Sequence, residues 1–325
     1  MNIVSLTENI ESLFFILYLF FLIRLYLTAI YFYKDNYLKK NIKNIRFDQQ
    51  KAPYGCELLE LDTLLKKLST FTYFGKTERI HFFIVMIITE GSGKHFVDFK
   101  EYQLERGTIL FIAPGQIQQY EPNPQYKGYM LIFTEYFFRK QANELSFLNQ
   151  SAIFDTTLSN ALVKPDPEIF SQMLQLLLLL QTEISSSYTF SKEESLQKLT
   201  SLFLIYSERQ KQMDSNHILN HRYLSQYYHF KQLLEQHFLL ERGVDFYASL
   251  LAITPKTLNR ITRSAIQKSA KELIDTRVII EIKRLLLFEK LSIKEIAYTL
   301  NFNEPTNLIK YFKKHTGQTP TAYKE

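Results

Sequence analysis

Two stretches of the sequence, 246–263 and 293–317, repeat one pattern of apolar and polar residues 49 or 50 positions apart. In the second stretch, apolar residues at i, i+3, i+4 and i+7 mark one face of a short helix: Ile293, Ile296, Ala297 and Leu300. The first stretch places Ala248, Leu251, Ile253 and Leu258 where the second has Ala297, Leu300, Phe302 and Leu308. The repeat therefore predicts two helical hairpins built on one plan.

The second helix of each predicted hairpin carries hydrogen-bond donors on its outer face. In the second hairpin Pro305 suits the first helical turn, and either Asn303 or Glu304 can cap that turn. A helix, a tight turn and a second helix with a polar outer face form the helix-turn-helix plan, whose second helix enters the major groove of DNA. The candidate DNA-binding residues are Lys256, Thr257, Asn259, Arg260 and Arg263, then Thr306, Asn307 and Lys310 for bases, and Lys313 and Lys314 for phosphates.

The segment between the hairpins predicts one long helix, from the spacing of Ile274, Val278, Ile282, Leu285 and Leu286. Such a helix would hold two reading helices about 34 Å apart, the distance between successive major-groove faces. Residues 217–325 also contain 17 Lys and Arg against 10 Asp and Glu, whereas the rest of the chain is nearly neutral. This asymmetry favours a polyanion, nucleic acid before membrane, as the partner of this third.

The middle of the chain has the texture of short strands, at 81–90, 94–99, 108–113 and 128–134. The segments GSG, ERG, PGQ and EPNP between them predict turns, and the whole predicts a small antiparallel barrel or sandwich. Two strongly apolar helices are then expected at 165–184 and 192–213. They either close the barrel or build the interface of a homodimer, and we expect both.

The N-terminal stretch 13–33 is strongly apolar, has Arg24 as its only charge and is long enough to span a bilayer. The lysines that follow it would keep the rest of the chain in the cytoplasm. Two interpretations stay open for residues 1–45: a membrane anchor, or sequence translated from a misplaced start. The single cysteine, Cys56, forms no internal disulfide, which also favours the reducing cytoplasm.

Residues 226–325 resemble the double helix-turn-helix domain of the AraC/XylS family of transcriptional regulators. The resemblance is carried by ITPKTLNRITR, by SAKELI and by SIKEIAYTLNFNEPTNLIKYFKKHTGQTPTAYKE. Two departures are Asn301, where the family often has Gly, and Ile266-Gln267, where Thr-Gly is common. Asn tolerates the left-handed conformation, so we expect the first departure to cost little. The second departure leaves open how the first recognition helix ends.

The resemblance also implies a cupin-like sensing barrel upstream, and residues 89–122 look like part of it. It would bind a small-molecule effector in a pocket lined by His81, His95, Gln119 and Tyr120, unless these are polar groups satisfied at strand ends. His95 is not followed by the second His of a cupin metal motif, so we expect no metal and no cofactor. The chain also lacks nucleotide-binding and nucleophile motifs, so we expect that the protein is not an enzyme.

The expected fold is therefore α+β, in four parts: a hydrophobic segment (1–45), a cupin-like sensing and dimerisation domain with flanking helices (46–215), a linker (216–225) and an all-α double helix-turn-helix domain (226–325). The expected function is regulation of transcription at promoter DNA, as a homodimer, with RNA polymerase as a further partner. Two alternatives are a membrane-tethered protein whose basic domain binds lipid, and a cupin metalloenzyme.

Overall fold

The computed structural model describes residues 43–70, 75–138, 148, 151–155, 160–187, 190–214, 221–289 and 291–324. The apolar stretch 13–33 lies outside the described residues, and of the expected segment 1–45 only Lys43–Ile45 are described, as strand β1. Within the described ranges, no helix has both the length and the apolar character needed to cross a membrane.

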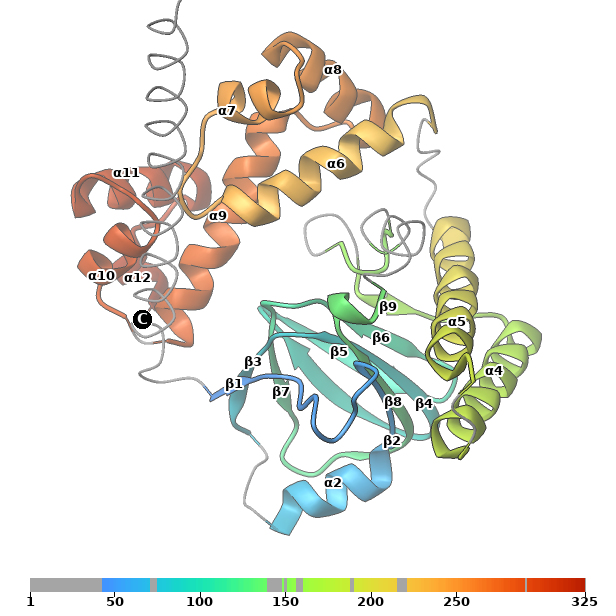
Figure 1. Ribbon diagram of the computed structural model, residues 1–325. Coiled ribbons are helices and arrows are strands. Elements are labelled where there is room, and N and C mark those ends of the chain that lie inside the picture. The colour runs from blue at the N-terminus through green and yellow to red at the C-terminus, as the bar shows by residue number, and fades with distance from the viewer. Residues whose placement is uncertain are drawn as a thin grey trace, which may run out of the picture. The chain divides into compact units, whose positions relative to one another are not determined.

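The first half of the described chain forms a curled, mostly antiparallel sheet (Figure 1). After β1, its strands are β2 (Cys56–Glu60), β3 (Thr77–Ile80), β4 (Phe83–Val97), β5 (Lys100–Glu105), β6 (Ile109–Ile112), β7 (Ile117–Tyr120), β8 (Gln125–Phe133) and β9 (Leu162–Val163). The long strand β4 is the centre of the sheet, because it pairs with β5, β6, β7 and β8. The helical domain described below follows this sheet, so the α+β expectation is confirmed.

The turn predicted at GSG was wrong, because β4 continues through these residues. Gly91 has a φ of 74°, and a Cβ atom there would lie 2.0 Å from the carbonyl oxygen of Gln125 on β8. The pairing of β4 with β8 shifts register just before it, between Ile88 and Glu90. A glycine inside a strand often marks such a bulge or a close backbone approach, rather than a turn.

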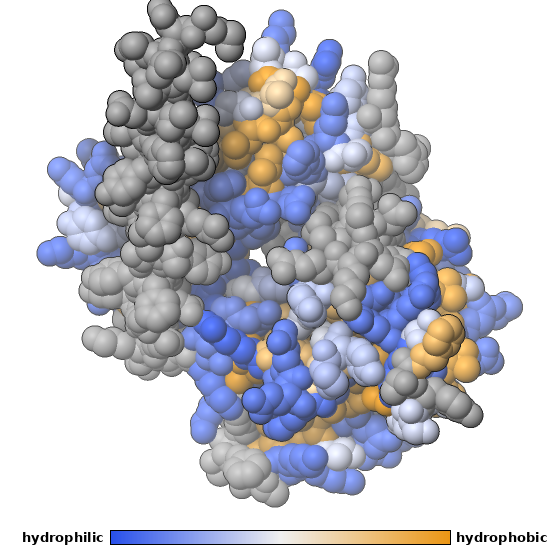
Figure 2. All heavy atoms as spheres, viewed as in Figure 1, coloured by the Kyte–Doolittle hydropathy of each residue, from blue (hydrophilic) through white to orange (hydrophobic). Residues whose placement is uncertain are grey.

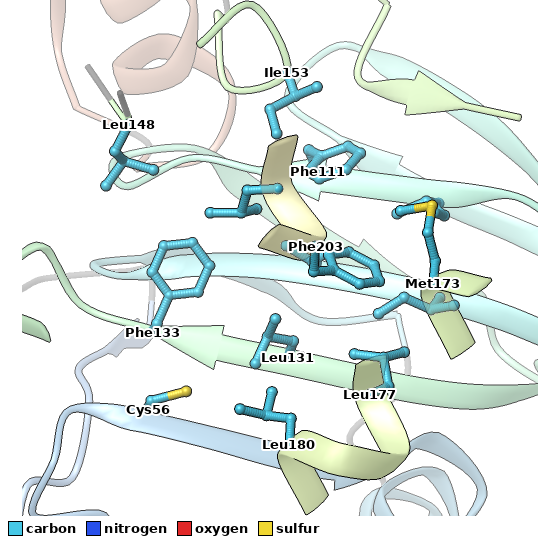
Figure 3. Close-up of a cluster of buried hydrophobic side chains, with 14 of the residues drawn as sticks. Cys56, Phe111, Leu131, Phe133, Leu148, Ile153, Met173, Leu177, Leu180 and Phe203 are labelled. Atoms are coloured by element: carbon cyan, nitrogen blue, oxygen red, sulfur yellow. The ribbon is translucent and has the colours of Figure 1, made fainter. Parts of the chain in front are cut away.

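The two faces of the sheet build two apolar cores, because successive strand residues point to opposite sides. Val85 and Ile87 of β4 face α4 (Pro167–Ser185) and α5 (Lys192–Asp214), which lie side by side in Figure 1. Figure 3 shows this core, with Leu177 and Leu180 of α4 next to Leu131 of β8. The intervening residues of β4 pack into the other core with α2 (Leu61–Thr70). The helices predicted at 165–184 and 192–213 are thus confirmed as a cover of the sheet.

The second half of the described chain is all helical. Its elements are α6 (His221–His237), α7 (Val244–Leu250), α8 (Pro255–Ile266), α9 (Ala270–Leu287), α10 (Ile293–Thr299), α11 (Pro305–Thr316) and α12 (Pro320–Lys324). Helix α9 contacts α7 and α8 of one hairpin and α10, α11 and α12 of the other (Figure 1). The expected linker 216–225 overlaps α6, which already begins at His221.

Helix α9 is fixed at its start by a capping box. The Ser269 hydroxyl accepts a hydrogen bond from the Glu272 N–H at 3.2 Å, and the Ser269 N–H donates to the Glu272 carboxylate at 2.7 Å. The five apolar residues that predicted the helix are all buried: Ile274, Val278, Ile282, Leu285 and Leu286. One helix therefore supports both hairpins, as the sequence predicted.

Candidate DNA interface and effector site

The turns of the two hairpins are built by matching backbone hydrogen bonds. In the first hairpin the Ile253 N–H donates to the Ala248 carbonyl at 3.0 Å. In the second, 49 residues later, the Phe302 N–H donates to the Ala297 carbonyl at 2.8 Å. The repeat in the sequence is therefore also a repeat in the structure.

Positive φ angles occur at the positions where the chain departs from the family pattern. Asn301 has a φ of 56°, and its counterpart Ala252 has a φ of 53°. Gln267 ends α8 with a φ of 60° and donates its N–H to the Arg263 carbonyl, just as Gly317 ends α11 with a φ of 81°. The first recognition helix thus ends in the usual left-handed cap, but with a side chain that disfavours it.

The recognition helices α8 and α11 both begin with proline in the first turn. Helix α8 is capped by Thr254, whose hydroxyl accepts from the Thr257 N–H at 3.1 Å, whereas Glu304 makes no side-chain cap bond at the start of α11. Leu308 and Phe312 are buried and fix α11 to the domain. The exposed predicted donors are Lys256, Arg260, Arg263, Thr306, Asn307, Lys310, Lys313 and Lys314, and Thr257 is half-buried.

Asn259 differs from the other predicted donors because its side chain bonds within the domain. Its amide N–H donates to the Pro255 carbonyl at 3.1 Å, and its oxygen accepts from the Ala270 N–H at 3.0 Å. This side chain therefore ties α8 to the start of α9. The sequence could not reveal this use, because Asn259 has the helical spacing of an outward-facing residue.

At the left edge of Figure 2, where grey atoms do not hide it, the surface beside α10 and α11 is hydrophilic, whereas hydrophobic side chains appear among polar ones near α7 and α8 and over α4 and α5. The last turn of α11 carries Lys313, Lys314 and His315. A helix that is apolar inside and cationic outside suits the phosphate groups that flank a DNA groove. The interface is thus chemically matched to nucleic acid.

Inside the curled sheet, polar side chains form a buried chain that starts at Glu78 of β3. The Gln118 amide donates to Glu78 at 3.5 Å, and its oxygen accepts from His95 Nε2 at 3.2 Å. The Tyr126 hydroxyl donates to His95 Nδ1 at 3.5 Å. Burial lowers the pKa of His95 to about 4 and raises the pKa of Glu78 to about 7, so His95 is neutral at neutral pH.

The four predicted effector residues do not gather at one place. His95 and Tyr120 lie together inside the sheet, with ring centroids 4.8 Å apart. His81 is exposed and bonds to Asn44, and Gln119 is half-buried on β7. Of the four, only His95 and Tyr120 lie together, and both ring nitrogens of His95 already have hydrogen-bond partners in Gln118 and Tyr126.

A cavity of about 150 Å³ lies elsewhere, beside the turn between β4 and β5. Aromatic rings dominate its wall: Phe99, Tyr102, Phe111 and Phe154. Polar or charged groups come from Asp98, Lys100, Gln116 and Asp155, and Ile280 of α9 also lines the cavity. None of the four predicted effector residues lines this cavity, which combines aromatic rings with charged and amide groups.

Buried ion pairs connect the sheet to α9 next to this cavity. Arg284 donates from Nε and one terminal nitrogen to Asp98, at 2.8 and 2.9 Å. Arg79 of β3 pairs with Glu281 at 2.9 Å and with Glu289 at 2.8 Å. Burial alone would raise the pKa of Glu281, but Arg79, Arg277 and Arg284 together hold it well below its usual range. The carboxylate is therefore charged at every physiological pH.

This ion network was not predicted from the sequence. Its only signal was the spacing of Arg277, Glu281 and Arg284, which lie on one side of a helix that is otherwise apolar there. Their partners Asp98 and Arg79 are about 200 positions away in the chain. Nothing in a single sequence connects such distant residues.

Comparisons with known proteins agree with both halves of this structure. The AraC-like ligand binding domain family matches residues 70–200, and a helix-turn-helix domain family matches residues 247–325. The Msm operon regulatory protein of Streptococcus mutans is 24% identical over 255 residues, which are 78% of this chain and 87% of that protein.

Solved structures also align with the chain. ToxT from Vibrio cholerae is 14% identical, with 82% of this chain and 96% of that chain covered and a TM-score of 0.36. The C-terminal domain of AraT, a response regulator from Geobacillus stearothermophilus, is 24% identical and covers 30% of this chain and 82% of its own, with a TM-score of 0.29. Two family matches in sequence order, over a curled sheet and a doubled hairpin, carry the assignment. The chain belongs to the AraC/XylS family of DNA-binding transcriptional regulators, with a ligand-binding domain followed by a helix-turn-helix domain.

Proposed function

We propose that this regulator reads promoter DNA with α8 and α11 together, each lying in a major groove. The observation that carries the proposal is the repeated hairpin, whose two second helices both expose donors on the face opposite their buried apolar residues. Helices presented in this way suit two half-sites one helical turn apart. The protein then acts by binding a specific promoter sequence, not by catalysis.

Individual side chains have different proposed roles. Lys256, Thr257, Arg260 and Arg263 on α8, and Thr306, Asn307 and Lys310 on α11, would contact base edges or the adjacent backbone. Lys313 and Lys314 would contact phosphates, because they stand at the C-terminal end of α11. Asn259 is left out, since its amide already bonds to Pro255 and Ala270.

The experiment is a binding titration against duplexes selected from random sequence by the wild-type protein. We expect Arg260→Ala and Lys310→Ala each to lower affinity by about 1–3 kcal/mol if the side chain reads a base. Lys313→Ala should instead reduce the salt slope of log affinity by about one.

Lys66→Ala is the matched control, because Lys66 is an exposed lysine on α2 of the sheet domain. Its affinity and salt slope should equal those of the wild type. Unchanged affinity in both Arg260→Ala and Lys310→Ala would refute the proposal. Binding of the wild type to anionic vesicles but not to DNA would favour the lipid alternative.

The effector site that we propose is the aromatic cavity beside the β4–β5 turn. Its volume, about 150 Å³, suits a small aromatic or branched apolar molecule with one polar group. Asp98 lies at this cavity and also holds Arg284 of α9, so a ligand there would meet one of the residues that connect the sheet to this helix. Ala161 also lines this cavity. Ala161→Phe, which would fill the cavity, should abolish the effector response of a reporter gene, whereas His95→Ala should abolish it only if the site lies inside the sheet.

We also propose that the protein is a cytoplasmic homodimer that meets RNA polymerase at the promoter. Leu178, Leu179 and Leu202 support the dimer, because they are exposed on α4 and α5. Leu180 of α4, by contrast, is buried in the core of the sheet domain. Within the described residues no group of three His, Cys, Asp or Glu side chains could hold a metal ion.

A further inference from the structure

A single arginine outside both recognition helices joins the two hairpins directly. Arg242 lies in the connection between α6 and α7, at the entrance of the first hairpin. Its guanidinium donates to the carbonyls of Leu300 and Asn301, the second at 2.8 Å. The same group lies 4.0 Å from the centre of the Phe302 ring. One side chain thus contacts three consecutive residues in the turn of the second hairpin.

The carbonyls that Arg242 binds are at the end of α10, where helical carbonyls have no partner within the helix. A cation there also interacts favourably with the negative end of the helix dipole. The guanidinium is suited to this position, because its planar fork can bond to two carbonyls while its face stacks on an aromatic ring. A lysine could reproduce only part of this geometry.

A second bond runs in the opposite direction between the same two segments. The Asn301 amide donates to the Leu240 carbonyl at 3.1 Å. Asn301 holds the left-handed turn of the second hairpin, so this bond attaches the turn itself to the entrance of the first hairpin. The two hairpins are therefore connected by donors from both sides.

The second recognition helix is connected to the same cluster. The Tyr311 ring of α11 contacts Phe302, with centroids 5.4 Å apart, and its hydroxyl donates to Asp275 of α9 at 2.7 Å. Lys271 pairs with Asp275 at 2.7 Å and donates to the Arg242 carbonyl at 3.1 Å. These contacts close a ring that runs from the first hairpin through α11 and α9 and back to the first hairpin.

We propose that Arg242 is a positioning residue that fixes the spacing and angle between the two recognition helices, and so determines which spacing of half-sites the protein accepts. The inference rests on the proposed function, since it needs both helices to read DNA. Helix α9 alone would leave each hairpin attached on one side. The cluster around Arg242 supplies a second attachment. A fixed arrangement of the two helices matters for binding, because one inserted base pair shifts one half-site relative to the other by about 3.4 Å and 35°.

The test compares affinities for the selected duplex with those for duplexes carrying one extra or one fewer base pair between the half-sites. We expect the wild type to lose about 30-fold or more per altered base pair. Arg242→Ala should lose about tenfold or less at the optimal spacing, and should bind the altered spacings within about fivefold of its own optimum. Arg242→Lys should recover part of the wild-type discrimination.

Two further variants separate positioning from other effects. Arg260→Ala, on the outer face of α8, should weaken binding at every spacing and leave the ratio between spacings unchanged. Asn301→Gly removes the amide bond to Leu240 but suits the positive φ, so it should fold and relax the discrimination in the same direction as Arg242→Ala. Circular dichroism confirms that each variant is folded.

The outcomes distinguish the inference from the proposed function. If Arg242→Ala and Asn301→Gly keep the wild-type ratio between spacings, or lose affinity equally at all spacings, the inference is wrong although the protein reads DNA. If the wild type selects no sequence at all, the proposed function fails first. A wild type that reads only one half-site, and so tolerates every spacing, would also overturn the inference.

Discussion

Arg284, a buried arginine of α9, allows a quantitative test of how strongly the ion pair with the sheet stabilises the protein. The Arg284 side chain is only 2% exposed, with Nε and one terminal nitrogen on Asp98 and the other terminal nitrogen 3.2 Å from Glu281. Replacing it with Met keeps most of the aliphatic volume but removes the charge. Asp98 would then keep two donors, the Gln116 amide and the Ile117 N–H, and would lose its only ion pair among the described contacts.

Removing one partner of a buried ion pair costs about 3–5 kcal/mol, because the other charge stays buried. We expect the lower end, about 3 kcal/mol, for Arg284→Met, since both carboxylates keep other donors. Asp98→Asn should cost about 2 kcal/mol, and the double variant should cost less than the sum of the two by about 1–3 kcal/mol. The coupling arises because neither partner is left unpaired in the double variant.

The free energies come from urea unfolding followed by circular dichroism, at one protein concentration. Lys294→Met on α10 is the control, because Lys294 is exposed and its loss should change stability by about 0.5 kcal/mol or less. A loss below about 1 kcal/mol for Arg284→Met would contradict the proposed burial of the charge. Strict additivity of the two single variants would show that Asp98 and Arg284 do not interact.

Three further predictions concern other parts of the chain. Burial raises the pKa of Glu78 from 4.5 to about 7, so the unfolded chain releases this proton at a lower pH than the folded chain does, and the free energy of unfolding falls as the pH rises from about 4.5 to 7. The free energy of unfolding of Glu78→Gln, measured in urea, should therefore rise relative to that of the wild type by about 2–3 kcal/mol between pH 5 and pH 8. Gln267→Gly should stabilise the protein by about 0.5–1 kcal/mol in thermal unfolding, and Gly317→Ala should destabilise it by about 1 kcal/mol, because both positions have a positive φ. Leu178→Glu with Leu179→Glu should shift sedimentation from dimer to monomer, and an unchanged sedimentation coefficient would rule out this face of α4 as the interface.

The parts of the fold that the sequence predicted are those with local periodicity. The hairpins at Ile293–Thr299 and Pro305–Thr316, and the helices that cover the sheet, have apolar spacings that only a helix produces. The sheet was predicted less well, because Gly91 in a strand and a glycine in a turn look alike in the sequence. The bulge in β4 depends on its neighbour β8, which a local pattern cannot contain.

The candidate site was predictable to the same extent. Helical spacing alone predicts which residues lie on the outer face of α11. All five are exposed: Thr306, Asn307, Lys310, Lys313 and Lys314. Asn259 has the same spacing but bonds to the start of α9, and the prediction could not see that partner. Arg242 was also missed, since its contacts at Leu300 and Asn301 are about 60 positions away. Long-range hydrogen bonds, not composition, decide these roles.

Both hairpins of this chain are attached to one helix, and that helix carries the charges that the sheet binds. A displacement of α9 through Asp98 or Arg79 is therefore shared by α8 and α11. The sheet domain has a second connection on the side of the first hairpin, where Lys231 of α6 pairs with Asp155 at 2.5 Å and the Tyr227 hydroxyl donates to the same carboxylate at 3.4 Å. A change in the sheet that moves α9 would thus reach both recognition helices through eighteen helical residues, Ala270–Leu287, whereas a change at Asp155 would reach α8 alone through α6.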